Sequence, residues 1–230
     1  MITNEVKDFS KIDFQTGEVI LVDKPFKWTS FNVVDKIRKS LRVKKVGHSG
    51  TLDPLATGLL IICTGKKTKE IYNYQNLNKT YSGTITLGIK TDSMDLDTQI
   101  IERKDVAEFS EEEILEIKDR FVGEIEQVPP MYSALKKNGK RLYKLARKGK
   151  TVEREKRKIA VNKFEIRKID LPNIEFEIEC SKGTYIRVIA NDFGDALGCG
   201  AVLSSLRRTR IGDFSVDSAF ELDNFLELVN

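Results

Sequence analysis

The sequence predicts an α+β fold with a mixed, largely antiparallel sheet and flanking helices. Apolar and polar residues alternate over 81–91, which is typical of a half-buried strand. Several other segments carry apolar residues at helical spacing. Strands and helices also follow one another without the regular strand–helix–strand rhythm that a doubly wound parallel sheet requires.

The N-terminal part begins with an expected strand over 18–25. It ends at Pro25, because the residue before a proline prefers extended geometry. A helix follows over 30–41, with Ser30 as the expected N-cap and apolar residues recurring on one face. The segment 58–65, with its unbroken apolar run over 59–63, predicts a buried strand.

A capping box marks the next helix, which is expected over 110–121. Ser110 is the expected N-cap, and Glu113 stands three positions later, so the two can satisfy each other's backbone N–H groups. The acidic character of this segment therefore has a structural explanation.

The C-terminal half continues with two expected strands, 159–169 and 174–180. A helix is then expected over 184–198, with Thr184 as N-cap and Gly198 at its end. Before these strands, a Pro-Pro pair opens a short helical stretch that a glycine ends.

Composition excludes several classes of protein. The longest apolar run, 59–63, is far too short to cross a bilayer, and the polar N-terminus resembles no secretory signal, so a cytoplasmic protein is expected. Three cysteines at distant positions and a single histidine cannot form a convincing zinc site, so the thiols are expected to be structural. No complete phosphate loop or dinucleotide-binding motif is present, and neither a metal nor a cofactor is expected.

Charge is concentrated in one segment, although the net charge is only +4. Residues 136–158 contain twelve Lys or Arg against two Glu, a local net charge of +10. Such a segment indicates either a contact with a polyanion such as nucleic acid or simply a solvated charged face, and charge alone does not decide between them.

The glycine-rich loop "GHSGTLDPLATG" contains the only histidine, His48, and the dipeptide Asp53-Pro54. The aspartate can be a turn residue whose carboxylate bonds nearby backbone N–H groups. It can also be a nucleophile or a general acid or base, provided that a cation keeps it ionised. His48 can be structural, and spacing alone leaves all these alternatives open.

Five segments, taken in order, resemble motifs of the TruB family of tRNA pseudouridine-55 synthases. They are "LVDKPFKWTSFNVV", "GHSGTLDPLATGLLIICTGKKTK", "NKTYSGTITLGIKTDSMDLDTQ", "QVPPMYSALKKNGKRLYKLARKG" and "CSKGTYIRVIANDFGDALGCGAVLSSLRRTRIG". The likeness extends over roughly residues 17 to 225. It implies a pseudouridine synthase catalytic fold and isomerisation of uridine 55 in the tRNA T loop, with the base flipped out.

The resemblance also implies roles for individual residues. Asp53 corresponds to the catalytic aspartate, and Arg187 to the arginine that pairs with it. Tyr81 corresponds to the tyrosine that packs on the target base and has been proposed to abstract a proton. Tyr185 and Leu206 correspond to residues that line the base pocket, and His48 to a histidine that holds the displaced base or its neighbours. Lys24 and Pro25 correspond to the motif that supports the catalytic loop.

The basic segment resembles the RNA-gripping insertion of the family, at about 129–158. Its expected RNA-binding residues are Lys136, Lys137, Lys140, Arg141, Lys144 and Arg147. The chain is expected to be one catalytic domain, 1–230, without a separate C-terminal PUA domain, and to act as a monomer on the tRNA T stem-loop without membrane or protein partner. Two alternatives are a non-catalytic RNA-binding module and a guide-dependent enzyme that works inside a ribonucleoprotein.

Overall fold

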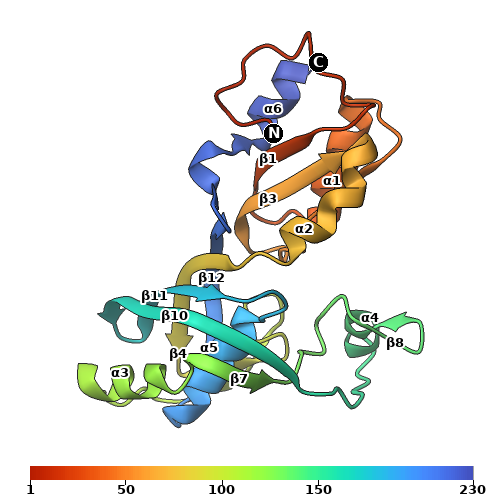
Figure 1. Ribbon diagram of the computed structural model, residues 1–230. Coiled ribbons are helices and arrows are strands. Elements are labelled where there is room, and N and C mark those ends of the chain that lie inside the picture. Colours follow the sequence, from red (N-terminus) through yellow and green to blue (C-terminus); the bar gives the residue numbers. More distant parts are fainter. Residues whose placement is uncertain (230) are drawn as a thin grey trace. The chain divides into compact units, whose positions relative to one another are not determined.

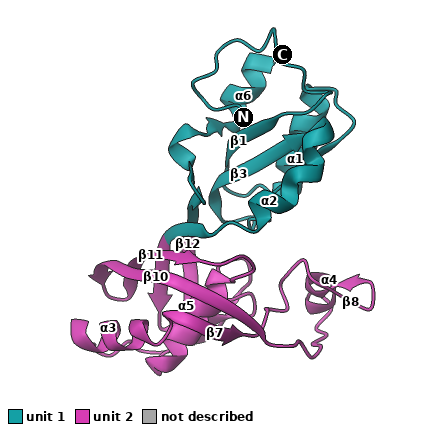
Figure 2. Ribbon diagram, in the orientation of Figure 1, with its two compact units in different colours: residues 1–82, 206–230 teal, residues 83–205 magenta. Residues whose placement is uncertain are grey.

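The computed structural model describes residues 1–229 and divides the chain into two compact units (Figure 2). Unit 1 contains residues 1–82 and the chain from Leu206 onward, and unit 2 contains Gly83–Ser205. Strands β4 (Lys79–Leu87) and β12 (Ala201–Ile211) each contribute residues to both units. Each unit combines helices with mainly antiparallel strands, which confirms the predicted α+β class.

The sheet of unit 1 is built around two apolar strands. Besides parts of β4 and β12, this unit contains β1 (Val19–Lys24), β2 (Val46–His48), β3 (Thr57–Thr64), β13 (Phe214–Ser215) and β14 (Phe220–Glu221). β1 pairs antiparallel with β3 and parallel with β14. β3 also pairs antiparallel with β2 and parallel with β12.

Both faces of the β1–β3 pair are buried, which explains the continuous apolar run at 59–63. The helical segments of unit 1 are α1 (Ser30–Ser40), η1 (Gly65–Glu70), α2 (Ile71–Gln75), η2 (Val216–Ser218) and α6 (Leu222–Val229). Ile20 and Leu60 pack in one core cluster with residues of α1 and α6. Leu21 and Leu59 pack in a second cluster with Ile211. Figure 1 shows α1 and α6 beside the strands β1 and β3.

Helix α1 begins one residue away from the predicted cap. Its N-cap is Thr29, whose side chain accepts a hydrogen bond from the backbone of Asn32 and forms a capping box with it. The predicted cap, Ser30, is instead buried and bonded to the backbone of Leu52. The Ser30 hydroxyl is therefore occupied by a tertiary hydrogen bond, and the neighbouring Thr29 caps the helix.

Unit 2 contains a four-strand path in the order β4, β11, β10, β7, together with two small hairpins. Its elements besides parts of β4 and β12 are β5 (Ile89–Thr91), β6 (Ile100–Arg103), α3 (Glu111–Asp119), β7 (Gly123–Gln127), β8 (Lys136–Lys137), β9 (Lys140–Arg141), α4 (Leu142–Ala146), β10 (Arg157–Asp170), β11 (Asn173–Cys180) and α5 (Ile186–Ala196). Phe193 of α5 contacts the rings of Phe164 on β10 and Phe121 after α3. These rings fix both helices on the sheet.

Most predicted elements of unit 2 are present, with two corrections at their ends. The capping box of Ser110 and Glu113 and the two strands now labelled β10 and β11 are confirmed. The predicted strand 81–91 is interrupted at Gly88, whose φ of +78° ends β4, and β5 pairs with β6 instead. The N-cap of α5 is Tyr185, not Thr184, because the Thr184 hydroxyl donates to the Ser181 carbonyl.

Candidate active site

Asp53 lies in the loop that joins β2 to β3, within unit 1. Its main-chain carbonyl accepts a hydrogen bond from the Ala56 N–H at 3.1 Å, so the Asp-Pro dipeptide does form a turn. The side chain of Asp53 is half-buried. The turn at Asp53 is therefore closed by a hydrogen bond between main-chain groups.

Both neighbours of Asp53 are bonded to one segment, residues 24–30, which we call the strap. The Leu52 N–H donates to Ser30 Oγ at 2.8 Å, and Ser30 Oγ donates to the Leu52 carbonyl at 3.2 Å. On the other side, Lys24 Nζ donates to the Pro54 carbonyl at 3.3 Å. The backbone of Asp53 is therefore fixed from both sides.

Lys24 is the centre of this arrangement and is completely buried. Its ammonium group also donates to the carbonyls of Pro25 at 3.0 Å and Trp28 at 2.5 Å. Burial lowers the pKa of Lys24 to about 8, and the negative charge of Asp53 partly opposes this effect. An ammonium group with three carbonyl acceptors links the strap to the Asp53 loop.

Arg208, on β12, is a second buried cation, with 1% of its surface exposed. Its Nε donates to the Leu59 carbonyl at 2.7 Å and its Nη2 to the Gly50 carbonyl at 3.2 Å. This arginine therefore holds the start of the loop against β3. Its positive charge also lowers the pKa of His48, one of the expected site residues.

His48 is mostly enclosed at the end of β2. Burial lowers its pKa, and the positive charge of Arg208 lowers it further, so the imidazole is neutral at pH 7. The Gly50 N–H donates to Nδ1 at 3.2 Å. Because Nδ1 is an acceptor, the proton is on Nε2, which can donate a hydrogen bond to a ligand.

The other end of the loop requires a close approach between two backbones. Gly58 has a φ of +105°, and a Cβ at this position would lie 2.3 Å from the Arg208 carbonyl oxygen. Asp23 accepts from the Gly58 N–H at 3.1 Å and forms a two-point ion pair with Arg207. Only glycine fits here, and the Asp23 carboxylate fixes where β3 begins.

The remaining expected residues of unit 1 lie on its strands and on the strap. Tyr81 is on β4 and is 9% exposed, so its ring is largely enclosed. Leu206 is half-buried on β12, next to Arg207. Pro25 belongs to the strap, and its carbonyl is one of the acceptors of Lys24. The structure thus brings Lys24, Pro25 and the Asp53 loop together.

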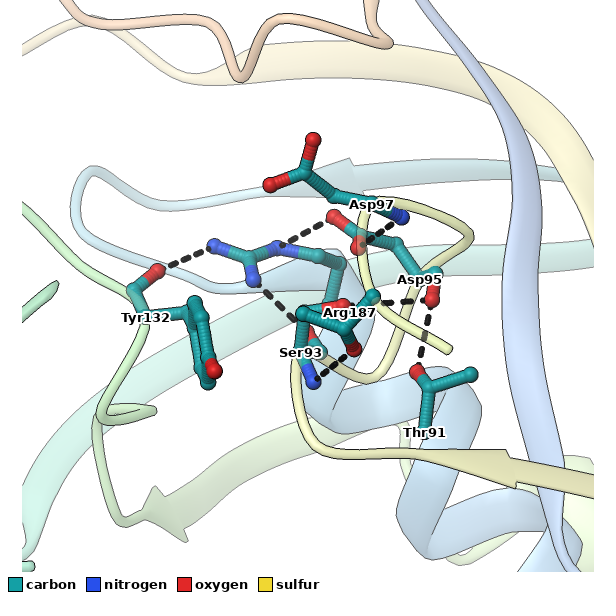
Figure 3. Close-up of polar contacts among 7 residues, drawn as sticks. Thr91, Ser93, Asp95, Asp97, Tyr132 and Arg187 are labelled. Atoms are coloured by element: carbon teal, nitrogen blue, oxygen red, sulfur yellow. Dashed lines mark hydrogen bonds and ion pairs between the residues drawn. The ribbon is translucent and has the colours of Figure 1, made fainter. Parts of the chain in front are cut away.

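Arg187 belongs to unit 2 and is buried in a polar network (Figure 3). Its Nη1 donates to the Ser93 carbonyl at 2.7 Å and its Nη2 to the Tyr132 carbonyl at 2.8 Å. Its Nε lies 3.5 Å from Asp95 Oδ2. The expected pairing of Arg187 with the catalytic carboxylate stays a prediction.

The loop that carries Asp95 is itself held by hydrogen bonds. The hydroxyl groups of Thr91 and Ser93 donate to the Asp95 carbonyl at 2.6 and 3.2 Å, and the Asp97 N–H donates to Asp95 Oδ1 at 2.9 Å (Figure 3). The carboxylate that faces Arg187 is therefore positioned before any ligand arrives.

Tyr185, at the start of α5, is positioned through its backbone. Its N–H donates to Gln127 Oε1 at 2.8 Å, and Gln127 Nε2 donates to the Tyr185 carbonyl at 3.1 Å. Gln127 is buried at the end of β7. One amide side chain thus fixes the residue two positions before Arg187.

The six expected RNA-binding residues lie on the β8–β9 hairpin, on α4 and just after it, and all six are exposed. Asn138 and Gly139 have φ angles of 51° and 75°, so they form the hairpin's tight turn. Leu142 is the buried residue of α4. The segment presents cations to solvent on a folded support.

The structure also locates the cysteines and the side chains that could bind a metal ion. The three cysteines are free and buried, and burial raises the pKa of Cys63 to about 11, so its thiol is protonated at neutral pH. Within residues 1–229, His, Cys, Asp and Glu side chains form no group of three that could hold a metal ion. None of the helices described is long and apolar enough to span a membrane.

Sequence reasoning missed four residues that position expected site residues within their own units: Ser30 as a loop anchor and Arg208 in unit 1, and Asp95 and Gln127 in unit 2. Each acts through a contact between segments distant in sequence, such as the 2.8 Å bond from Leu52 to Ser30. Only Asp95 had a local signal, the acidic run "TDSMDLD" after an expected strand. A carboxylate of such a run that becomes buried needs a cationic partner.

Comparison with known proteins identifies the family of the chain. The model "TruB family pseudouridylate synthase (N terminal domain)" matches residues 38–186, and "tRNA pseudouridylate synthase B C-terminal domain" matches residues 187–230. A tRNA pseudouridine synthase B from Flavobacterium johnsoniae is 48% identical over 222 residues, which cover 94% of this chain and 97% of the relative. One from Chloroherpeton thalassium is 49% identical over 218 residues, covering 93% and 90%.

Solved structures give a similar result. A chain from the crystal structure of a Cbf5-Nop10-Gar1 complex superposes with a TM-score of 0.74 at 30% sequence identity. The likeness covers 99% of the present chain but 58% of the other one. The shared fold thus includes nearly all of the chain described above.

Proposed function

The chain belongs to the TruB family of pseudouridylate synthases and is an isomerase, and we propose that its substrate is uridine 55 in the T loop of tRNA. The proposed reaction breaks the N1–C1′ bond of the uridine, rotates the base and joins C5 to C1′, while the C5 proton is lost and N1 gains a proton. No redox change occurs, and no cofactor is proposed.

The observation that carries this proposal is the double anchoring of the Asp53 loop. Leu52 and Pro54 are each bonded to the strap, so the carboxylate between them is held in place. A fixed carboxylate can attack or electrostatically stabilise the electron-poor C1′, or help to remove a sugar proton. The buried ammonium group of Lys24 interacts electrostatically with Asp53 and is bonded to the Pro54 carbonyl, so the same cation attracts the carboxylate and anchors its loop.

Binding of the base is assigned to residues with aromatic or apolar side chains. A uridine within folded RNA must be flipped out, which costs a few kcal/mol of stacking. The Tyr81 ring is proposed to pack on the flipped base, since such stacking returns ~1–3 kcal/mol per base. Tyr185 and Leu206 are proposed to line the pocket. The neutral His48, with its proton on Nε2, is proposed to hold the displaced base or its neighbours.

The segment 129–158 is proposed to grip the RNA through phosphate contacts. Its exposed cations would position the T stem-loop without reading its sequence. We propose that the enzyme works as a single catalytic domain and a monomer in the cytoplasm, although the Cbf5 chain it resembles was solved with other proteins.

The test is to incubate the purified protein with unmodified tRNA transcript and to map pseudouridine at single-nucleotide resolution. We expect product at position 55 alone, and no product with Asp53→Asn, which keeps the size of the side chain but removes its charge. If RNA binds and the wild-type protein forms no product, the chain is an RNA-binding module. If product appears only after a guide RNA and protein partners are added, it is a guide-dependent enzyme.

A further inference from the structure

The strap carries an exposed aromatic ring close to the Asp53 loop. Phe26 is 54% exposed and stands two residues after Lys24, whose ammonium group is bonded to Pro54. The same ammonium group is bonded at 3.0 Å to the carbonyl of Pro25, the residue directly before Phe26. The backbone at Phe26 therefore lies close to the loop that carries the proposed catalytic aspartate.

The turn that displays Phe26 is fixed. The Trp28 N–H donates to the Pro25 carbonyl at 3.4 Å, and Lys24 Nζ donates to the carbonyls of both residues. Phe26 and Lys27 form the tip of this closed turn. A single exposed apolar residue is common on a protein surface, so exposure alone indicates nothing. Here, however, the exposed ring stands on a rigid support.

Lys27 adds a positive charge and an unusual backbone. Its φ is 63°, a left-handed conformation that glycine adopts without strain and a lysine rarely adopts. Its ammonium nitrogen lies 5.6 Å from the centroid of the Phe26 ring. The turn therefore places an aromatic ring and a cation next to each other. This is the combination with which proteins bind single-stranded RNA, the ring stacking on a base and the cation contacting the backbone.

We propose that Phe26 and Lys27 form a second RNA contact beside the reaction centre. Phe26 stacks on a base next to the target uridine, and Lys27 contacts the adjoining phosphate. The proposal rests on the proposed function, because flipping out the uridine removes a stacking partner from its neighbours. The ring replaces that partner and stabilises the flipped state. The strap would thus hold both the catalytic loop and the RNA around it.

The test uses an unmodified T stem-loop RNA in which 2-aminopurine replaces, one at a time, the bases flanking the target. Stacking on an aromatic ring quenches the fluorescence of 2-aminopurine. We expect the wild-type protein to quench one of these positions and Phe26→Ala to lose that quenching, with the Kd for RNA raised about tenfold. Phe26→Trp should restore both signals, because it retains an aromatic surface.

Lys27→Asn tests the cation without disturbing the turn, since asparagine tolerates the left-handed conformation. We expect Tm to stay the same or rise, while the slope of log affinity against log salt falls by about 0.7. Ile101→Ala is the matched control, because Ile101 is 62% exposed on β6 in unit 2, and it should leave the Kd and the quenching unchanged.

The inference is overturned if Phe26→Ala binds the RNA as the wild type does and leaves 2-aminopurine quenching unchanged at every position. It is also overturned if Phe26→Leu restores binding as fully as Phe26→Trp, which would indicate apolar contact without stacking. Pseudouridine formation by the wild-type protein is measured in parallel. If wild type forms no product, the proposed function fails, whereas normal turnover with an inert Phe26 contradicts this inference alone.

Discussion

Arg187 and Asp95 form a buried ion pair, with Nε of the arginine 3.5 Å from Oδ2 of the aspartate. Only 4% and 8% of their side chains are exposed. The same guanidinium donates to the carbonyls of Ser93 and Tyr132. The position of Arg187 therefore depends on the loop 91–97 as much as on its own helix.

The first prediction concerns the charge of Asp95. Asp95→Asn preserves the size of the side chain and an oxygen for the Asp97 N–H, but leaves Arg187 without its buried anion. We expect the free energy of unfolding to fall by about 3 kcal/mol, as when one partner of a buried pair is removed. Urea unfolding measures the loss, and single-turnover pseudouridine formation should fall as well.

Asp97→Asn is the control for this loop, because Asp97 is exposed and its contact to Asp95 uses the backbone N–H. It should change the free energy of unfolding by less than about 0.5 kcal/mol. Equal stability of Asp95→Asn and the wild type would show that the hydrogen bonds to Ser93 and Tyr132 hold Arg187 without the ion pair.

The contrast between local and distant contacts explains what could be predicted from the sequence. The capping box of Ser110 and Glu113 was predicted correctly, because its parts lie three residues apart. The cap of α1 was assigned to Ser30 instead of Thr29, because the decisive partner of Ser30 is Leu52, 22 residues away. The Asp95–Arg187 pair was not predicted at all, because no periodicity links residues so distant in sequence.

The second prediction separates two roles of Tyr81. Tyr81→Phe retains the ring and Tyr81→Leu does not. If the hydroxyl takes part in proton transfer, Tyr81→Phe should bind RNA with the wild-type Kd and turn over very slowly. If the ring only stacks, Tyr81→Phe should stay active and Tyr81→Leu should bind about tenfold more weakly.

Single-turnover rates and Kd values measured on the same RNA decide between these roles. Tyr74→Phe is the matched control, because the Tyr74 ring packs edge-on against Phe214 in unit 1 and has no assigned role in catalysis. Weaker binding by Tyr81→Phe at an unchanged single-turnover rate would contradict the proton-transfer role.

The third prediction concerns Lys24 and pH. Its pKa is about 8 in the folded protein and 10.5 when unperturbed, so between these values the unfolded chain binds more protons. The contribution of Lys24 to the free energy of unfolding therefore rises as the pH increases from about 8 to 10.5, by about 3 kcal/mol in total. Below pH 8, Lys24 is protonated in both the folded and the unfolded chain, so the free-energy cost of burying its charge is present in full.

Comparison with Lys24→Met isolates this effect. Cys63, whose pKa is raised to about 11, destabilises the folded state as pH rises from 9, but it does so in both proteins and cancels. The difference in stability, wild type minus Lys24→Met, should increase when urea unfolding is repeated from pH 7 to 10. Lys36→Met, at an exposed position of α1, should show no such trend. A flat difference for Lys24→Met would mean that the ammonium keeps its proton throughout.

The fourth prediction tests how the basic segment acts. Lys140→Ala and Arg141→Ala remove exposed cations of β9 without touching the buried Leu142. If each contacts one phosphate, the slope of log affinity against log salt should fall by roughly 0.7–0.9 per residue. Product should still form at the same uridine, because phosphate contacts carry no sequence information.

The chain offers a matched control for charge on the long strand β10. Lys163 and Arg167 are exposed there, but both form ion pairs with Glu165 and Glu177, so their charges are already compensated. Replacing them with alanine should leave the salt slope unchanged. If the Lys163 and Arg167 variants lower the salt slope as much as the β9 variants do, the affinity for RNA depends on the net charge of the protein and not on a contact at the β8–β9 hairpin. A changed site of modification in the β9 variants would instead mean that the hairpin selects the uridine.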